Sequence, residues 1–236
     1  MSPASPRPSR LARVRASLDA SIGDIAFGME DGAVSIAGLV FGVAASTNDP
    51  QVVLLAGASG AAAGAVAMMA GTYLDVQSTR DRAIAQRDAA SGSIAADPEG
   101  HRRRIEERLR AAGFSEAEAS TVGAALVRNP EAMLDYVVGL ELGTGSAPRE
   151  SPREHAIWMF IADIIAAATP VIPFAFLPLE QARVVSIVMT TLLLVGLGIG
   201  RARVGHTPVG RTVLQTLAIA AAAAAAGVAI GRLVTG

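Results

Sequence analysis

Long runs of residues without charge, separated by charged stretches, constrain the fold of this 236-residue chain more than any other feature. Residues 51–74, for example, contain no Asp, Glu or Arg. About 20 consecutive apolar residues form a helix that crosses the hydrocarbon core of a bilayer. The pattern predicts five transmembrane helices, at about residues 22–46, 51–74, 155–179, 184–200 and 212–231. A soluble bundle with buried helices is the alternative, and the low charged content of 17% argues against it.

The charged residues divide the chain into four predicted parts. Residues 1–16 are a basic tail rich in Pro, Ser and Arg, which we expect to be disordered. Residues 17–78 hold transmembrane helices 1 and 2, residues 79–152 a cytoplasmic helical domain, and residues 153–236 transmembrane helices 3 to 5. The predicted fold is an all-α integral membrane protein, with a three-helix insert between transmembrane helices 2 and 3.

Local signals mark the helices of the insert. Glu99–Ala112 is rich in Arg, with Ile105 and Leu109 four residues apart. Ser115 and Glu118 have the spacing of a capping box, which predicts that a second helix begins there. Asn129-Pro130 supplies an N-cap and a first-turn Pro for a third helix, Glu131–Leu142.

The arginines predict the orientation in the membrane. All 20 basic residues are Arg, and 18 of them lie in the tail, in residues 75–154 or in residues 201–211. Because basic residues gather on the cytoplasmic side, the N-terminus is predicted to be cytoplasmic and the C-terminus extracytoplasmic. Only Arg183 and Arg232 fall outside this set. The Ala- and Arg-rich composition favours a bacterial inner membrane, while the net charge of −1 gives no support for nucleic-acid binding.

Ionisable residues within the predicted spans are candidates for function, because a charge at membrane depth is costly. Three stand out: Glu30, Asp31 and Asp163. Glu30 and Asp31 have a second interpretation, in which they lie at the interface and are solvated by water and headgroups. Asp163 either pairs with a nearby Arg or lines a polar path.

Several segments, taken in order, resemble the vacuolar iron transporter family. They are Asp31-Gly32-Ala33-Val34-Ser35, Gly38-Leu39-Val40, Ala63-Gly64-Ala65-Val66-Ala67-Met68, Gly71-Thr72-Tyr73-Leu74, Asn129-Pro130, Leu134-Asp135, Glu141-Leu142-Gly143 and Pro170-Val171-Ile172-Pro173. The resemblance covers about residues 20–234. It implies a homodimer of five-helix protomers in the lipid bilayer, which exchanges cytosolic Fe²⁺ or Mn²⁺ for protons along a path between the protomers.

The family's membrane ligands fall on Asp31 and Met68, a carboxylate and a thioether. Other family positions differ here. Gly60 stands where iron-transporting members have a Glu, and Ala83–Ser91 and His101–Arg104, which contain no Glu, stand where the family has Glu-rich segments of the insert. A Met pair is replaced by Val137-Val138, which leaves Glu141 as the remaining ligand position of the insert. Arg is not a metal ligand.

Two functions follow as hypotheses. The first is a metal/proton antiporter that uses Asp31, Met68, Asp163, Glu30 and Glu141, with Fe²⁺ or Mn²⁺ as cargo and no tightly bound cofactor. The second is a transport-inactive homologue that serves as an accessory subunit of a larger membrane complex with other membrane protein subunits. The sequence lacks a nucleophile–base pair and a phosphate-binding Gly loop, so we do not expect an enzyme.

Overall fold

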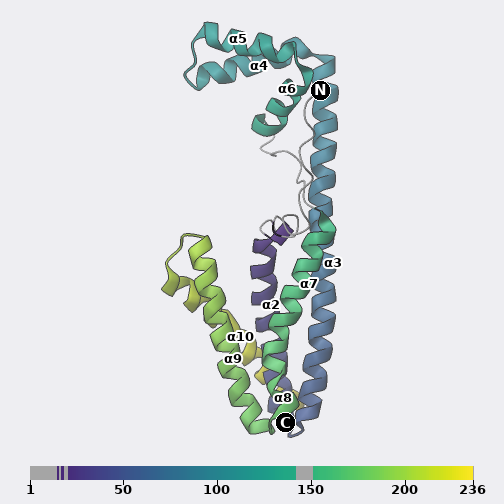
Figure 1. Cartoon of the computed structure of the whole chain (residues 1–236), viewed down its shortest axis with the longest axis vertical. Helices are drawn as coiled ribbons and strands as arrows, with labels where there is room; N and C mark the ends of the chain where they lie inside the picture. Colours follow the sequence, from purple (N-terminus) through teal and green to yellow (C-terminus); the bar gives the residue numbers. More distant parts are fainter. Residues whose placement is uncertain (1–14, 16, 19–20, 142–150, 236) are drawn as a thin grey trace. The chain divides into compact units, whose positions relative to one another are not determined.

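The computed structural model describes residues 15, 17–18, 21–141 and 151–235 (Figure 1). These residues form helices without a strand, which confirms the predicted all-α class. Apart from Arg15, the predicted basic tail lies outside the described residues. The helices are α2 (Ile22–Ser46), α3 (Pro50–Ala96), α4 (Pro98–Ala111), α5 (Glu116–Val127), α6 (Pro130–Tyr136), the π-helix η1 (Val137–Glu141), α7 (Pro152–Val171), α8 (Pro173–Phe176), α9 (Leu179–Val204) and α10 (Val209–Thr235).

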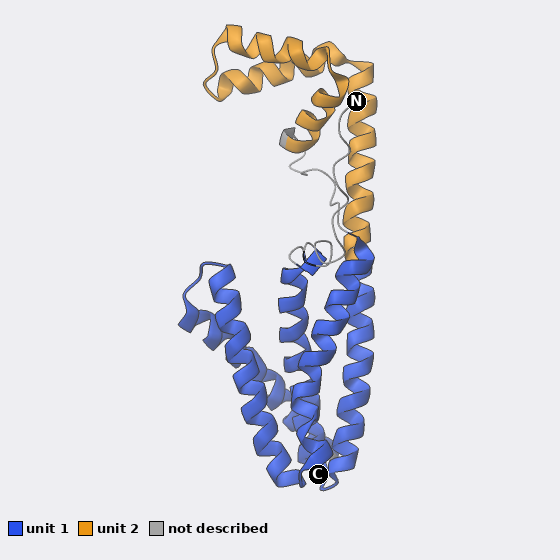
Figure 2. Cartoon of the chain, in the orientation of Figure 1, with its two compact units in different colours: residues 1–74, 150–236 blue, residues 75–149 orange. Residues whose placement is uncertain are grey.

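Five of the described helices, α2, α3, α7, α9 and α10, are long and apolar enough to cross a membrane, as the sequence predicts. The chain divides into two compact units, residues 1–74 with 150–236 and residues 75–149 (Figure 2). The helix α3 contributes to both units, because it continues beyond Leu74 to Ala96 without a break.

Helix ends in the first unit follow from capping and proline chemistry. Pro50 opens α3, and the Asp49 carboxylate accepts a hydrogen bond of 2.8 Å from the Gln51 amide. Near the end of α7, prolines at 170 and 173 interrupt the backbone hydrogen bonding. The buried hydroxyl of Ser186 in α9 donates to the Pro170 carbonyl at 2.8 Å. A side chain therefore satisfies a carbonyl at this helix break, as membrane proteins require.

Glycine residues let α2 approach two other helices closely. A Cβ atom on Gly38 would lie 3.0 Å from the Ala223 carbonyl oxygen of α10, and one on Gly42 would lie 2.6 Å from the Gly227 carbonyl oxygen. Gly38 and Gly42, a small-xxx-small pair, thus form a close contact with α10. The pair Gly196/Gly200 of α9 has the same spacing, but no atom of the described residues lies within 4 Å of either added Cβ.

The second unit has its own core and well-defined helix starts. Ile105, Met133, Val137 and Val138 are buried together with residues of α3. The predicted capping box at Ser115 is present: its hydroxyl accepts from the Glu118 amide, and the Glu118 carboxylate accepts from the Ser115 amide at 2.8 Å. The Ser115 hydroxyl also donates to the Glu118 carboxylate at 2.7 Å, and this hydrogen bond, with the one from the Ser115 amide, holds the pKa of Glu118 below its ordinary value.

Candidate functional site

The helices α2 and α7 meet along a seam at which side chains of α7 lie against glycines of α2. Asp163 of α7 is buried, with 2% of its surface exposed. A Cβ atom on Gly32 would lie 2.6 Å from the Asp163 Oδ1 atom and 2.7 Å from its carbonyl oxygen. The absence of a side chain on Gly32 therefore makes room for the Asp163 carboxylate between the two helices.

One helical turn earlier, the seam repeats the same arrangement. A Cβ atom on Gly28 would lie 2.5 Å from the sulfur of Met159, which is 3% exposed. Gly28 and Gly32 are four residues apart, as are Met159 and Asp163, so each pair lies on one helix face. The seam thus brings a thioether and a carboxylate of α7 into adjacent turns.

Asp31 adds a second carboxylate to this level of the seam. It is half-buried, it adjoins Gly32, and its charge is close enough to that of Asp163 to interact with it. Within the described residues, neither carboxylate has a hydrogen bond or an ion pair. The sequence allowed two interpretations of Asp163, an ion pair with an Arg or a place along a polar path. The described part of the structure contains no such ion pair.

Glu30 lies next to Asp31 but is bound to other groups. One of its carboxylate oxygens pairs with Arg201 of α9 at 2.6 Å, and the other accepts a hydrogen bond of 2.8 Å from Thr216 of α10. The Glu30 side chain, 18% exposed, therefore joins α2 to α9 and α10.

The seam begins with a hydrogen bond between His155 Nδ1 of α7 and the Asp24 carboxylate of α2. Asp24–His155, Gly28–Met159 and Gly32–Asp163 follow each other in the same order on both helices, so α2 and α7 run parallel. The eight residues from Asp24 to Gly32 span about 12 Å of helix. The three contacts share one register, in which Asp163 lies against Gly32, next to Asp31.

Comparison with known proteins agrees with this membrane architecture. The sequence profile of the VIT family matches residues 22–232, which include both units. The chain belongs to the VIT family. Among its relatives, vacuolar iron transporter 1 of Arabidopsis thaliana is 29% identical over 212 residues, 89% of this chain and 85% of the relative.

Two further relatives of the VIT-family chain have the same range of similarity. Vacuolar iron transporter 1 of Tulipa gesneriana is 30% identical over 213 residues, 89% of this chain and 86% of the relative. The vacuolar iron transporter of Centaurea cyanus is 30% identical over 209 residues, 87% of this chain and 84% of the relative. The matched region includes the whole α2–α7 seam.

The two remaining ligand positions suggested by the resemblance to the VIT family lie elsewhere. Met68 is half-buried on α3 and belongs to none of the hydrophobic clusters among the described residues. Glu141 is the last residue of η1 in the second unit. No group of three or more His, Cys, Asp or Glu in the described part of the chain could hold a metal ion.

Carboxylates of the second unit of this VIT-family chain are bound to arginines. Glu106 is 8% exposed and lies 2.7 Å from Arg102 and 3.6 Å from Arg110. A hydrogen bond to Glu99, with the charge of Glu106, raises the pKa of Arg102. The arginine-rich helix α4 thus forms ion pairs inside the unit.

Sequence reasoning missed Met159 and the pairing of His155 with Asp24. The pair Gly28/Gly32, one helical turn apart beside Asp31, was a usable signal, because small residues in that spacing mark a close helix contact. The spacing of His155, Met159 and Asp163 by four residues along α7 was a second. The partner of each helix face depends on tertiary packing, which neither pattern specifies.

Proposed function

We propose that this chain transports a divalent first-row metal ion, Fe²⁺ or Mn²⁺, across a membrane, and that Asp31 and Asp163 bind the ion at the α2–α7 seam. The observation that carries the proposal is the burial of Asp163 beside Asp31 without a cationic partner among the described residues. A buried carboxylate without a cationic partner is costly unless it binds a metal ion or a proton. The names of the relatives, vacuolar iron transporters, supply the class of cargo.

The donor atoms at the seam suit such an ion. Carboxylate oxygens bind Mn²⁺ and Fe²⁺, and a thioether adds a softer donor that favours the later metals. Met159 supplies a thioether one turn from Asp163. Glu30 stands beside the site as an ion pair, since both of its oxygens already bind Arg201 and Thr216.

The two carboxylates also provide a basis for proton exchange. Their mutual repulsion is relieved either by a metal cation or by a proton, so arrival of one favours departure of the other. We propose metal/proton antiport on this basis, with export from the cytoplasm, an N-terminus in the cytoplasm and a bacterial inner membrane as its location. In the proposed homodimer, the half-buried Asp31 and Met68 of both protomers contribute to one path.

Transport by purified protein in liposomes tests the proposal. Wild type should take up Fe²⁺ or Mn²⁺ and move protons in the opposite direction, detected by a pH-sensitive dye. Asp31→Asn and Asp163→Asn should each abolish both signals. Asp88→Asn, an exposed position on α3, is the matched control and should leave them unchanged. Wild-type uptake by Asp163→Asn would remove the seam from the transport path.

A second function, an inactive accessory subunit, is favoured by the ion pairs of the second unit. Glu106 and its arginines bind each other, which leaves those carboxylates occupied. This function predicts no uptake by wild type in the same liposomes, together with other membrane subunits in constant ratio after native purification. Uptake by the isolated protein would exclude it.

A further inference from the structure

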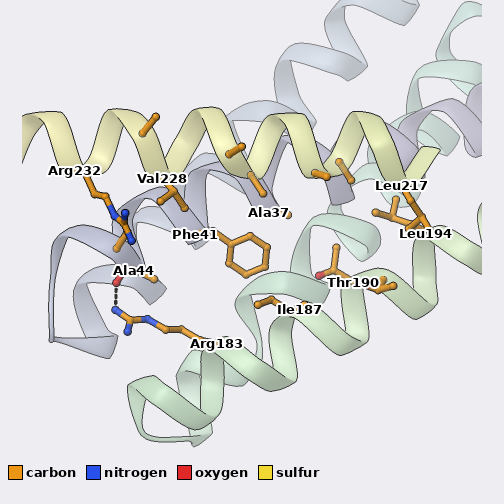
Figure 3. A pocket seen from close by; sticks show the side chains of 17 residues that line it. Ala37, Phe41, Ala44, Arg183, Ile187, Thr190, Leu194, Leu217, Val228 and Arg232 are labelled. Carbon is orange, nitrogen blue, oxygen red and sulfur yellow. Dashed lines mark hydrogen bonds between the residues drawn. The ribbon is translucent and has the colours of Figure 1, made fainter. Parts of the chain in front are cut away.

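A long groove separates α9 from α10, with α2 as its floor (Figure 3). Its volume is about 1050 Å³, at the upper end of the range for small-molecule sites. Phe41, Ile187, Leu194 and Leu217 line it together with a row of alanines of α10. The groove is therefore apolar along most of its length and wide enough for a chain of methylene groups.

One end of the groove is cationic. Arg183 near the start of α9 and Arg232 near the end of α10 both line it, and Figure 3 draws their guanidinium groups on the same side of Phe41. Arg183 pairs with Glu180 at 2.6 Å and donates to the Ala44 carbonyl. Arg232 has no hydrogen bond or ion pair with any described residue. Arg183 and Arg232 are also the two arginines that lie outside the regions predicted to be cytoplasmic.

A polar group also lies unsatisfied within the apolar part. The Thr190 side chain lines the groove, the residue is 4% exposed, and its hydroxyl has no hydrogen-bond partner in the described structure. Thr190 is seven residues from Arg183, or about 10 Å deeper along α9. A buried hydroxyl without a partner is costly, so a ligand with an acceptor at this depth would satisfy it.

We infer that this groove binds an anionic phospholipid, with the phosphate at Arg183 and Arg232, an ester carbonyl toward Thr190, and an acyl chain along α10. Both arginines lie within a few residues of a helix end, which in a bilayer is the level of the headgroups. The apolar length of the groove then lies at the level of the acyl chains. Arg binds phosphate through two parallel hydrogen bonds, which matches an anionic headgroup. This site is independent of metal transport.

Native mass spectrometry of the full chain in mild detergent tests the inference, with phosphatidylglycerol and phosphatidylcholine of identical acyl chains as probes. Wild type should retain phosphatidylglycerol in preference to phosphatidylcholine. Arg232→Gln should reduce the retained phosphatidylglycerol about tenfold, the usual effect of one charge-assisted hydrogen bond. Arg203→Gln, an exposed position on α9 outside the groove, is the control with the same charge change and should retain the lipid.

A second pair of variants tests the location without touching charge. Ala221→Phe fills the groove and should reduce retention of phosphatidylglycerol, whereas Ala222→Phe, on α10 but outside the groove lining, should not. Equal retention by Arg232→Gln and wild type, or by Ala221→Phe and Ala222→Phe, would overturn the inference. So would full competition by glycerol phosphate, which would indicate a free-anion site. If Ala221→Phe changes the number of protein subunits instead of the lipid count, the groove is an interface between copies.

Discussion

Substitution of Gly32 by Ala perturbs the α2–α7 seam at the point where the structure is least able to adapt. The new Cβ would lie 2.7 Å from the Asp163 carbonyl oxygen, 0.7 Å less than the 3.4 Å of an ordinary contact. Since that oxygen belongs to the backbone of α7, the helices must separate. Overpacking of this kind lowers the free energy of unfolding by about 1–3 kcal/mol, and we expect about 3 kcal/mol here because the clashing atom belongs to the backbone. Ala is about 1 kcal/mol more favourable than Gly within a helix, so the net destabilisation is about 2 kcal/mol.

Thermal unfolding in detergent, followed by size-exclusion chromatography, measures this effect. A loss of about 2 kcal/mol corresponds to a Tm about 4–8 °C lower for a chain of this size. Gly196→Ala is the matched control, because no atom lies within 4 Å of its added Cβ and its Tm should not fall. Gly32→Ala should also slow metal uptake, since Asp163 moves away from Asp31. A Tm at or above wild type would refute the close packing at this seam.

Three further predictions concern the second unit, and hydrogen exchange measures each of them. Because the pKa of Glu118 is lowered in the folded state, its carboxylate stabilises α5 above its ordinary pKa, and this stabilisation is lost as the pH falls through the folded pKa. Hydrogen-exchange protection of the first turn of α5 should therefore fall in mild acid. Glu118→Gln should abolish that pH dependence. Glu106→Gln should lower the stability of the α4–α5 pair by about 1–3 kcal/mol, because it removes the charge of the buried carboxylate that Arg102 and Arg110 share and leaves them only their more exposed partners, Glu99 and Glu116. Asp135→Asn, which removes an exposed ion pair with Arg87, should change protection by less than about 0.5 kcal/mol, and a larger change would contradict this distinction between exposed and buried pairs.

Features that depend on local sequence were predictable. Uncharged runs predicted the five spanning helices, and the cap residues Ser115 and Asn129 marked helix starts that the structure contains. No helix was predicted for residues 75–98, because charged residues begin at Asp75, where the second span was expected to end. Charge marks a solvent boundary, whereas a helix ends where the backbone changes direction, and α3 ends only before the Asp97-Pro98 cap.

Features that depend on contacts between distant residues were not predictable. The ion pair of Glu30 with Arg201 joins residues 171 positions apart, and the hydrogen bond of Asp24 with His155 joins residues 131 apart. A charged side chain in a spanning helix indicates that a partner exists, and only packing specifies which one. The unusual position of Asp163 in an apolar helix was evident from its neighbours along the chain, whereas its proximity to Gly32 and Asp31 depends on the packing of α7 against α2.

Binding of Mn²⁺ to the purified protein, measured by electron paramagnetic resonance, tests most directly whether Asp31 and Asp163 hold one ion together. Wild type should bind Mn²⁺. Asp31→Asn and Asp163→Asn should each weaken the affinity by about tenfold or more, since each variant keeps only one of the two carboxylates that bind the ion. The double variant should be little weaker than either single one, because the two residues form one site. Asp88→Asn should bind like wild type. Wild-type affinity in Asp163→Asn would contradict the proposed site.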